Sequence, residues 1–400
     1  MYRGHQAGRL QVRYRGRLPV GARWCPPRQR HRKLGCPKHR SRDHMTQNRG
    51  PATAEALLAR LTATPDAYPQ KLDLIRQGWL VIEFAEAAYR TASFLDDRIL
   101  APSTRGGWLP IDRVIEAAQR ASAKPLHFIF HTGHVGSTLV SRLLDETGLV
   151  LSLREPLPLR TLADAHDVLR QPESLLSPER FDELLATQMC LWSRGYPGTE
   201  CVVVKATSSA ARLAPLILAN NDTRAIYLNQ RAESAITTLL AGQNSPIDLR
   251  GHGPGRMQRL CARLGRALTP LHSLSPGELA GMSWLAESLC RRDVIARFSG
   301  QVLAVDFDEF LADVAGGMRH VLAQFGLPID ERELLQLAAS PVLTRYSKAP
   351  EHPYGPTLRA QVLDQARSEH RAEITKGLAW LAALAESDQS VAAVLEPGAI

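Results

Sequence analysis

The distribution of apolar residues changes near residue 124, and the two parts of the chain predict different structures. From Thr53 to about Ala123 apolar residues recur at spacings of three and four, as in "AEALLARL", which predicts a helical segment. Beyond it, five short apolar runs alternate with helical patterns. Such runs predict a mostly parallel sheet covered by helices on both faces. The runs are "LHFIF" (126–130), "LVLSL" (149–153), "CVVVK" (201–205), "RAIYL" (224–228) and "QVLAVDF" (301–307).

The same pattern divides the chain into domains. Residues 45–123 form the helical N-terminal segment, and residues 124–330 form a three-layer α/β core with a five-stranded sheet. Residues 331–400 form a C-terminal helical extension with a long final helix. Ser177-Pro178-Glu179 and Ser275-Pro276-Gly277-Glu278 predict the starts of two core helices.

Positive charge is concentrated at the N-terminus. Residues 1–44 hold thirteen Lys and Arg against one acid, whereas the whole chain has a net charge of +9, so the rest is slightly acidic. Few large apolar residues occur there, which predicts a disordered basic tail. The tail is a candidate nucleic-acid-binding arm, an Arg-rich transit peptide, or an upstream extension with Met45 as the working start. We favour the extension and expect no nucleic-acid partner.

Cysteine use and hydropathy predict a cytoplasmic protein without a membrane partner. Cys190, Cys201, Cys261 and Cys290 lie in apolar helix or strand patterns without disulfide-like spacing, which predicts buried reduced thiols. The two cysteines of the basic tail lack the CxxC pairing of zinc sites. The longest apolar runs fall far short of the roughly 18 residues that a membrane-spanning helix needs.

A glycine-rich turn follows the first apolar run of the core. In "HTGHVGST" (131–138), Gly133 and Gly136 allow a tight turn, and Ser137 and Thr138 place hydroxyls and amides at the start of a helix. Successive N–H groups at a helix N-terminus form an anion site. The turn lacks the GxxxxGK[ST] motif and an evident acidic metal partner, which disfavours a metal-dependent ATPase or kinase. We therefore expect a phosphate site that works without a metal.

The order strand, x-G-x-x-G-S-T, helix and second strand ending in an acid resembles the sulfotransferase family, specifically its bacterial and Golgi-type branches. Two later segments agree in order, "IYLNQRAESAITTLLAG" (226–242) and "AVDFDEFLADVAGGMRHVLAQFGLP" (304–328). The resemblance covers about residues 124–330 and implies a P-loop NTPase-like fold. It also implies that the loop binds the 5′-phosphosulfate of the donor 3′-phosphoadenylyl sulfate (PAPS).

His134 is the first departure from the family pattern. The family loop has Lys or Arg at this position, where the charge reaches the oxygen that bridges phosphorus and sulfur. Negative charge grows on that oxygen as the sulfuryl group leaves, and a donor aimed at it stabilises the transition state. An imidazolium supplies charge and a proton, and a neutral imidazole supplies one hydrogen bond, so His134 is a catalytic candidate. The alternative is a histidine that caps a backbone carbonyl. The resemblance implies that the other contacts to the 5′-phosphate come from Gly133, Val135, Gly136, Ser137 and Thr138.

The resemblance also implies a general base and a lysine. In "REP" (154–156), Glu155 takes the place of the family's base, which removes the acceptor proton. The alternative is a structural acid that pairs with arginine, and Arg154 is a candidate partner for Glu155 or for the donor. Lys205 matches a lysine of cytosolic sulfotransferases, but Thr207 replaces their catalytic histidine, which strengthens the case for Glu155. Lys205 either faces the sulfuryl group or reaches solvent.

The residues at the family's contacts to the 3′-phosphate of PAPS are the second departure from the family pattern. Gln230 and Thr238 stand where the family has Arg and Ser, and Arg231 is displaced by one residue. Arginine suits bidentate phosphate contact, so Arg231 is the leading candidate, with an exposed surface charge as the alternative. Thr238 either keeps the hydroxyl contact or is an ordinary helix residue. In "RYSKAPEHPYGP" (345–356), Lys348 is a candidate phosphate contact on a loop that folds over the nucleotide.

Three functions fit these patterns. The leading one is a PAPS-dependent sulfotransferase that acts on a hydroxyl or amine of a small-molecule or carbohydrate acceptor. The second is a non-catalytic module that binds a nucleotide such as adenosine 3′,5′-bisphosphate, which the replacements at His134 and Gln230 favour. The third is a small-molecule kinase on a P-loop scaffold, which the missing lysine and Mg²⁺ ligands oppose. The patterns identify neither the acceptor nor the oligomeric state.

Overall fold

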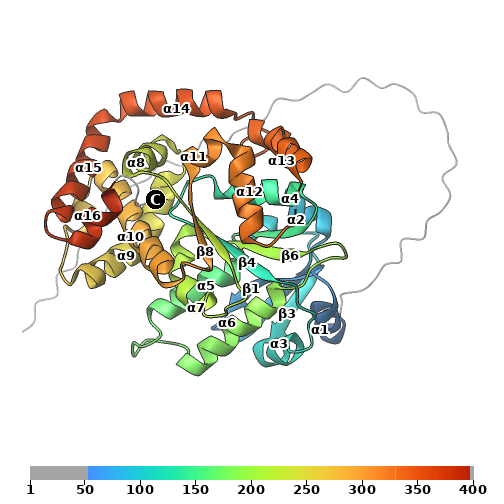
Figure 1. Cartoon of the computed structure of the whole chain (residues 1–400). Helices are drawn as coiled ribbons and strands as arrows, with labels where there is room; N and C mark the ends of the chain where they lie inside the picture. Colours follow the sequence, from blue (N-terminus) through green and yellow to red (C-terminus); the bar gives the residue numbers. More distant parts are fainter. Residues whose placement is uncertain (1–52, 329, 397–400) are drawn as a thin grey trace, which may run out of the picture. The chain divides into compact units, whose positions relative to one another are not determined.

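A five-stranded parallel sheet forms the centre of the computed structural model, which describes residues 53–328 and 330–396 (Figure 1). Its strands lie in the order β5-β6-β4-β7-β8, and each pairs with its neighbours in parallel. The predicted α/β fold class is confirmed, whereas the predicted basic tail over residues 1–44 lies outside the described residues. The strands are β4 (Leu126–His131), β5 (Val150–Arg154), β6 (Cys201–Lys205), β7 (Ala225–Asn229) and β8 (Val302–Asp306).

The order of the strands determines where a ligand site forms. β5 and β6 lie on one side of β4, and β7 and β8 lie on the other. The carboxyl ends of the parallel strands meet at one edge, and the loop after β4 lies where the two halves of the sheet diverge. At this edge Arg154 is in register with Lys205, and Asn229 is in register with Asp306. The strand ends that carry the predicted site residues are therefore neighbours.

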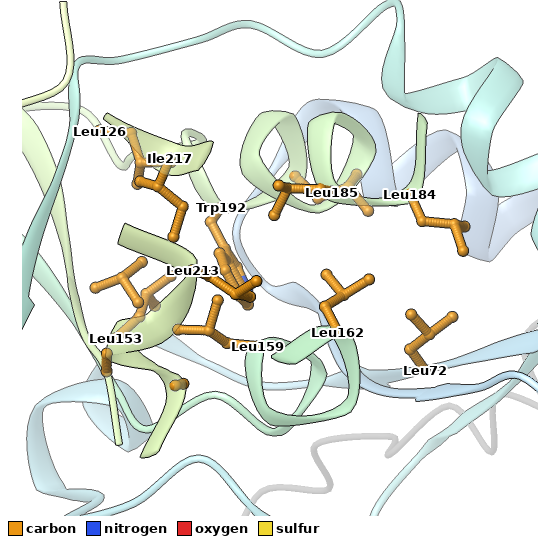
Figure 2. Close-up of a cluster of buried hydrophobic side chains, with 14 of the residues drawn as sticks. Leu72, Leu126, Leu153, Leu159, Leu162, Leu184, Leu185, Trp192, Leu213 and Ile217 are labelled. Atoms are coloured by element: carbon orange, nitrogen blue, oxygen red, sulfur yellow. The ribbon is translucent and has the colours of Figure 1, made fainter. Parts of the chain in front are cut away.

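Side chains of the strands alternate between two buried cores. Phe128 and Phe130 of β4 belong to one core, and Ile129 between them belongs to the other. The first core also holds the apolar faces of α5 (Leu157–Asp167) and α6 (Pro178–Trp192). Figure 2 shows this cluster. Its labelled residues include Leu159, Leu162, Leu184, Leu185, Trp192, Leu213 and Ile217, with Leu72 of the N-terminal segment.

The second core is covered by helices that lie on the right in Figure 1. They are α4 (Ser137–Glu146), α12 (Val314–Gln324) and α13 (Glu331–Ala338), with α11 (Phe307–Ala312) at the end of β8. A third core joins the helices on the left in Figure 1. These are α8 (Ala232–Ala241), α9 (Ser245–Leu264), α10 (Pro276–Arg297), α15 (Arg371–Ala385) and α16 (Gln389–Leu395).

Two predicted helix starts are confirmed by their caps. Ser177 accepts a hydrogen bond from the backbone of Arg180 at the start of α6. Ser275 and Glu278 form a capping box at the start of α10. Short helices complete the core: η2 (Ser208–Leu213), α7 (Ala214–Ile217) and η3 (Leu271–Ser273).

The prediction of a helical segment over residues 45–123 is wrong for much of its described part. A three-stranded antiparallel sheet occupies it, with the order β1-β2-β3. Leu72, Trp79 and Val81 are buried in strand positions. The spacing of two between Trp79 and Val81 was hidden because apolar residues also fall at helical intervals. Gln77 makes the turn of the first hairpin with a φ of 51°. The elements are α1 (Ala54–Ala63), β1 (Ala67–Asp73), β2 (Gly78–Glu83), α2 (Glu86–Thr91), η1 (Asp97–Ile99), β3 (Gly106–Pro110) and α3 (Ile111–Ala118).

The described C-terminal extension is helical, but the predicted long final helix is two helices. α14 (Pro356–Glu369) ends at His370, whose φ of −110° and ψ of 17° leave the helical region, and α15 follows. The break lets α15 pack closely on α10. A Cβ added at Gly277 of α10 would lie 1.8 Å from the carbonyl oxygen of Glu373 in α15. Before α14, η4 (Pro341–Thr344) leads into the loop that contains Lys348.

Three of the four described cysteines are less buried than the sequence predicted. Cys201 is buried, whereas Cys190, Cys261 and Cys290 are half-buried, and all four are free thiols. Among the residues that the structure describes, no helix is both long and apolar enough to cross a bilayer.

Candidate active site

The glycine-rich turn between β4 and α4 adopts a left-handed backbone at three positions. Gly133, His134 and Gly136 have φ values of 107°, 53° and 69°. Gly136 is the N-cap of α4, so the backbone N–H groups of the first helical turn face the loop. The Thr138 hydroxyl is enclosed and has no hydrogen-bond partner in the structure. The turn therefore has the backbone geometry and spare donors of an anion site.

Gly136 is required by a close approach as well as by its φ. A Cβ at this position would lie 1.9 Å from the ring of Phe307, which closes over the turn from α11. We expect Gly136→Ala to displace Phe307, to lower the free energy of unfolding by about 1–3 kcal/mol and to weaken nucleotide binding. Denaturant unfolding and nucleotide titration of the variant measure both effects. Gly148→Ala is the matched control, since it also has a positive φ but open space around it, and unchanged binding by Gly136→Ala would contradict this role.

His131 holds the turn in place, a role that the sequence did not suggest. Its Nδ1 accepts a hydrogen bond from the N–H of Gly133 at 3.1 Å, so Nε2 carries the proton and donates to the carbonyl of Ala206 at 2.9 Å. Burial and then the charge of Lys205 lower the pKa of His131 well below its usual value. His131 is therefore a neutral structural link between the turn and the end of β6.

His134 is neutral at physiological pH. Burial lowers the pKa of His134 to about 4, and the charge of Lys348 contributes in the same direction, against the opposing charges of Asp248 and Glu155. Of the two forms that the sequence allowed, the free protein contains the neutral imidazole, which can donate one hydrogen bond. His134 therefore lies near enough to Lys348, Asp248 and Glu155 for their charges to act on it.

Glu155 and Lys205 form a buried ion pair beside the turn. The pair joins the ends of adjacent strands, and the N–H of Glu155 also donates to the carbonyl of Lys205 at 2.7 Å. The Lys205 side chain is 1% exposed and that of Glu155 is 13% exposed, so Lys205 does not reach solvent. Burial lowers the pKa of Lys205, and the charge of Glu155 opposes this. The structure thus brings His134, Glu155 and Lys205 together.

Backbone strain marks two of these residues. Apart from Gln77 in its hairpin, His134 and Glu155 are the non-glycine residues with a positive φ in the described chain, each at 53°. A left-handed conformation costs such residues free energy and occurs often at functional sites. The sequence had no signal for this feature.

Arg154 does not belong to the site. Its guanidinium pairs with Asp145 and donates to the carbonyls of Tyr89 and Ala92 at 2.8 and 2.7 Å. It neither pairs with Glu155 nor faces the turn, so both predictions for Arg154 are wrong. Instead, Arg154 attaches α2 to the end of β5.

Arg256 of α9 is a site residue that the sequence analysis missed. Its side chain is 1% exposed, and it donates to Ser208 Oγ at 2.9 Å. Ser208 Oγ lies 3.6 Å from where a Cβ of Gly133 would be, so Arg256 is one residue removed from the turn. Its other donors bind Glu287 at 2.9 Å and Asp248 at 3.3 Å. Pro254 and several glycines hid α9, although its polar residues recur every four positions.

A second group of polar residues lies at the end of β7. Gln230 is buried and donates to Asp308 at 3.1 Å, and Arg359 of α14 donates to the same carboxylate at 2.7 Å. Arg359 thus brings a cation to the strand end where Gln230 replaces arginine. Arg231 is exposed at the N-cap of α8, and the enclosed hydroxyl of Thr238 has no partner in the structure.

Lys348 lies near the turn. Arg142 of α4 donates to the carbonyl of Ser347 at 2.7 Å and so holds the loop against the helix. Lys348 is half-buried, and its charge acts on His134, His131 and Lys205. The structure therefore brings the predicted covering loop and its lysine to the candidate site.

Comparisons with known proteins give similarity only at the level of solved structures. No family model and no curated protein matches the chain. The similar solved structures include a sulfotransferase domain from the curacin biosynthetic pathway, with 14% identity, 61% of this chain and 91% of that chain covered, and a TM-score of 0.35. A sulfotransferase from Mycobacterium avium has 14% identity, 81% and 96% coverage, and a TM-score of 0.35. A retinol dehydratase in complex with retinol and PAP has 12% identity, 77% and 97% coverage, and a TM-score of 0.28. At such values the fold and the site rest on the geometry described above.

Proposed function

We propose that the protein transfers a sulfuryl group from PAPS to a hydroxyl or amine. The observation that carries this proposal is the buried Glu155–Lys205 pair beside an anion-binding turn that has no lysine of its own. A carboxylate next to a buried cation fits proton removal from an acceptor and charge stabilisation on a transferring group. The turn supplies backbone N–H groups to a phosphate.

The polar groups without partners fit an anionic nucleotide. Among residues 53–328 and 330–396, the enclosed hydroxyls of Thr138 and Thr238 have no hydrogen-bond partner, and Lys348 makes no ion pair. In the proposed complex the turn and Lys348 hold the 5′-phosphosulfate, whereas Thr238 and Arg359 hold the 3′-phosphate, with Arg231 as a further candidate. Arg359 is favoured over Arg231 because it reaches the end of β7 and is half-buried.

The chemical step follows from the arrangement of the charged groups. Glu155 takes the proton of the acceptor as the acceptor oxygen or nitrogen forms a bond to sulfur. The bond between sulfur and the bridging oxygen breaks, and its electron pair stays on that oxygen, to which neutral His134 donates a hydrogen bond. As Glu155 becomes neutral, Lys205 loses its anionic partner and its charge is available to the oxygens of the sulfuryl group. This exchange explains why a general base would be held in an ion pair.

The role of His134 is tested by two replacements. We expect His134→Ala to lower kcat about 10²-fold because one donor to the leaving oxygen is lost, with little change in affinity for adenosine 3′,5′-bisphosphate. His134→Asn is the matched control, because asparagine tolerates a positive φ and keeps an N–H donor. Since the pKa of His134 in the free protein is about 4, kcat/KM shows no ionisation of this group between pH 6 and 8. Equal kcat values for the wild type and His134→Ala would show that His134 has only a structural role.

A non-catalytic nucleotide-binding module is the second candidate. The neutral state of His134 and the presence of Gln230 in place of arginine favour it. The assay that separates the two is transfer of labelled sulfate from PAPS to a pool of alcohols, phenols, amines and sugars by the full chain. Labelled product supports the transferase, whereas binding of PAPS without any transfer supports the module.

A further inference from the structure

Ser208 lies against the first glycine of the turn. A Cβ at Gly133 would lie 3.6 Å from the Oγ of Ser208 and 3.8 Å from its Cβ. The serine therefore occupies the side of the turn toward which a side chain at residue 133 would project. Ser208 is 7% exposed, and Gly133 beside it is half-buried. Ser208 thus places an enclosed hydroxyl next to the anion-binding turn.

Two hydrogen bonds to the backbone of Ala206 hold the segment that carries Ser208 against β4. The N–H of Ala206 donates to the carbonyl of Ile129 at 3.0 Å, and His131 donates to the carbonyl of Ala206 at 2.9 Å. Since His131 also accepts from the N–H of Gly133, one imidazole joins the segment to the turn. The position of Ser208 beside the turn is therefore fixed by short contacts on both sides.

Arg256 determines where the hydroxyl proton of Ser208 can point. Its guanidinium is 1% exposed and donates to Ser208 Oγ at 2.9 Å, to Glu287 at 2.9 Å and to Asp248 at 3.3 Å. Because arginine only donates, Ser208 Oγ uses a lone pair for Arg256, and its own proton points elsewhere. Within residues 53–328 and 330–396, no group accepts that proton. A donor therefore remains available beside Gly133.

The acids around Arg256 decide how it can act on a ligand. Glu287 and Asp248 both pair with Arg256, so its charge is offset by two carboxylates. We therefore expect Arg256 to attract an anion only weakly by its charge alone. Its hydrogen bond to Ser208 instead polarises the hydroxyl and strengthens it as a donor, as in other chains of hydrogen bonds.

We propose that Ser208 donates a hydrogen bond to an oxygen of the 5′-phosphosulfate group at the turn, and that Arg256 positions the hydroxyl for this contact. The inference rests on the proposed function, because it takes the turn as the site of that group. The turn has no lysine of its own. Ser208 adds a donor from the side of β6, whereas the N–H groups of the helix come from the side of α4.

The test of Ser208 compares adenosine 3′,5′-bisphosphate with adenosine 3′-monophosphate, which lacks only the 5′-phosphate, in calorimetric titrations of the full chain. We expect Ser208→Ala to bind the bisphosphate about tenfold more weakly, the loss typical of one hydrogen bond to a charged group. It should bind the monophosphate within about twofold of the wild type, because the lost contact is at the 5′ end. Ser208→Cys, whose thiol is a weak donor, should fall between the two.

The matched control is the neighbouring serine of the same short helix. Ser209 is 3% exposed, and among the described residues neither Gly133 nor Arg256 contacts its side chain. Ser209→Ala therefore removes a hydroxyl of similar burial from the same segment. It should bind both nucleotides like the wild type.

The role of Arg256 is tested through Ser208. Arg256→Lys keeps a positive charge beside Glu287 but loses the planar guanidinium that binds three groups at once. We expect this change to weaken bisphosphate binding about threefold or more in the wild type and to cause no further loss in Ser208→Ala. Equal losses in the two backgrounds would overturn the positioning role of Arg256.

The outcomes separate this inference from the proposed function. Equal bisphosphate binding by the wild type and Ser208→Ala overturns the assignment of Ser208, and an equal loss for both nucleotides does so as well. If Ser208→Ala does not fold, Ser208→Cys provides the comparison, and an unchanged preference for the bisphosphate then overturns the assignment. Failure of the wild type to bind the bisphosphate contradicts the proposed function instead.

Discussion

Glu155→Gln is expected to lower kcat for sulfuryl transfer by about 10²–10⁴-fold, the usual contribution of a positioned general base. Glutamine has nearly the same shape, and its carbonyl oxygen can still accept a hydrogen bond from Lys205, but it cannot take the acceptor proton. Because Glu155 lies outside the turn, the affinity for adenosine 3′,5′-bisphosphate should change little. Single-turnover kinetics with PAPS and titration of the bisphosphate measure the two quantities separately.

A matched control distinguishes loss of the base from loss of structure. Glu200→Gln removes an exposed carboxylate just before β6, at the opposite edge of the sheet from Glu155, and should leave kcat unchanged. The thermal midpoint of Glu155→Gln shows whether the unpaired Lys205 destabilises the fold. A kcat for Glu155→Gln within about threefold of the wild-type value would show that another group removes the proton.

Arg256→Met should lower the free energy of unfolding by about 3–5 kcal/mol, the cost typical of breaking a buried ion pair. The side chains of Arg256 and Glu287 are each 1% exposed, so methionine would leave a buried carboxylate with Arg259 as its remaining cation, at 3.2 Å. Urea unfolding at neutral pH measures the loss. The double variant Arg256→Met with Glu287→Met removes both charges and should recover much of the stability.

The control for Arg256 is an exposed arginine of the same helix. Arg263→Met breaks a pair with Asp293 whose side chains are 31% and 53% exposed, and it should cost at most about 1 kcal/mol. If Arg256→Met were no more destabilising than Arg263→Met, the cluster of Arg256, Glu287 and Asp248 would not support the site. Because Arg256 also binds Ser208 beside the turn, weaker bisphosphate binding should accompany the loss of stability.

The sheet was predictable from the sequence because its strands are buried on both faces. Burial of this kind requires continuous apolar runs such as "CVVVK". Runs of this length that are rich in β-branched residues are typical of buried strands and are too short for a buried helix. The N-terminal hairpins were missed because "LVIE" and its neighbours satisfy helical and strand spacings equally well, and packing of Trp79 and Val81 in the core decided between them. The α9 helix was missed because Pro254 and its glycines are poor helix formers, and its packing on α10 overrides that preference.

The candidate site was predictable only in part. The residues of the turn, Glu155 and Lys205 follow strands, and residues that follow parallel strands must lie at one edge of the sheet. The pairing of Glu155 with Lys205 depends on β5 lying next to β6. The local pattern of apolar residues does not determine the order of the strands in the sheet. Arg256 and Arg359 come from helices far along the chain. Their approach to the turn is a consequence of tertiary packing.

The most direct test of the central claim is a calorimetric titration of the full chain with adenosine 3′,5′-bisphosphate and, separately, with ATP and Mg²⁺. A turn without a lysine and with cations at the end of β7 should prefer the ligand that carries a 3′-phosphate. The expected result is saturable binding of the bisphosphate with a Kd at least about tenfold below that of ATP, a difference of about 1.4 kcal/mol. Tighter binding of ATP, or no binding of the bisphosphate, would contradict a PAPS site on this fold.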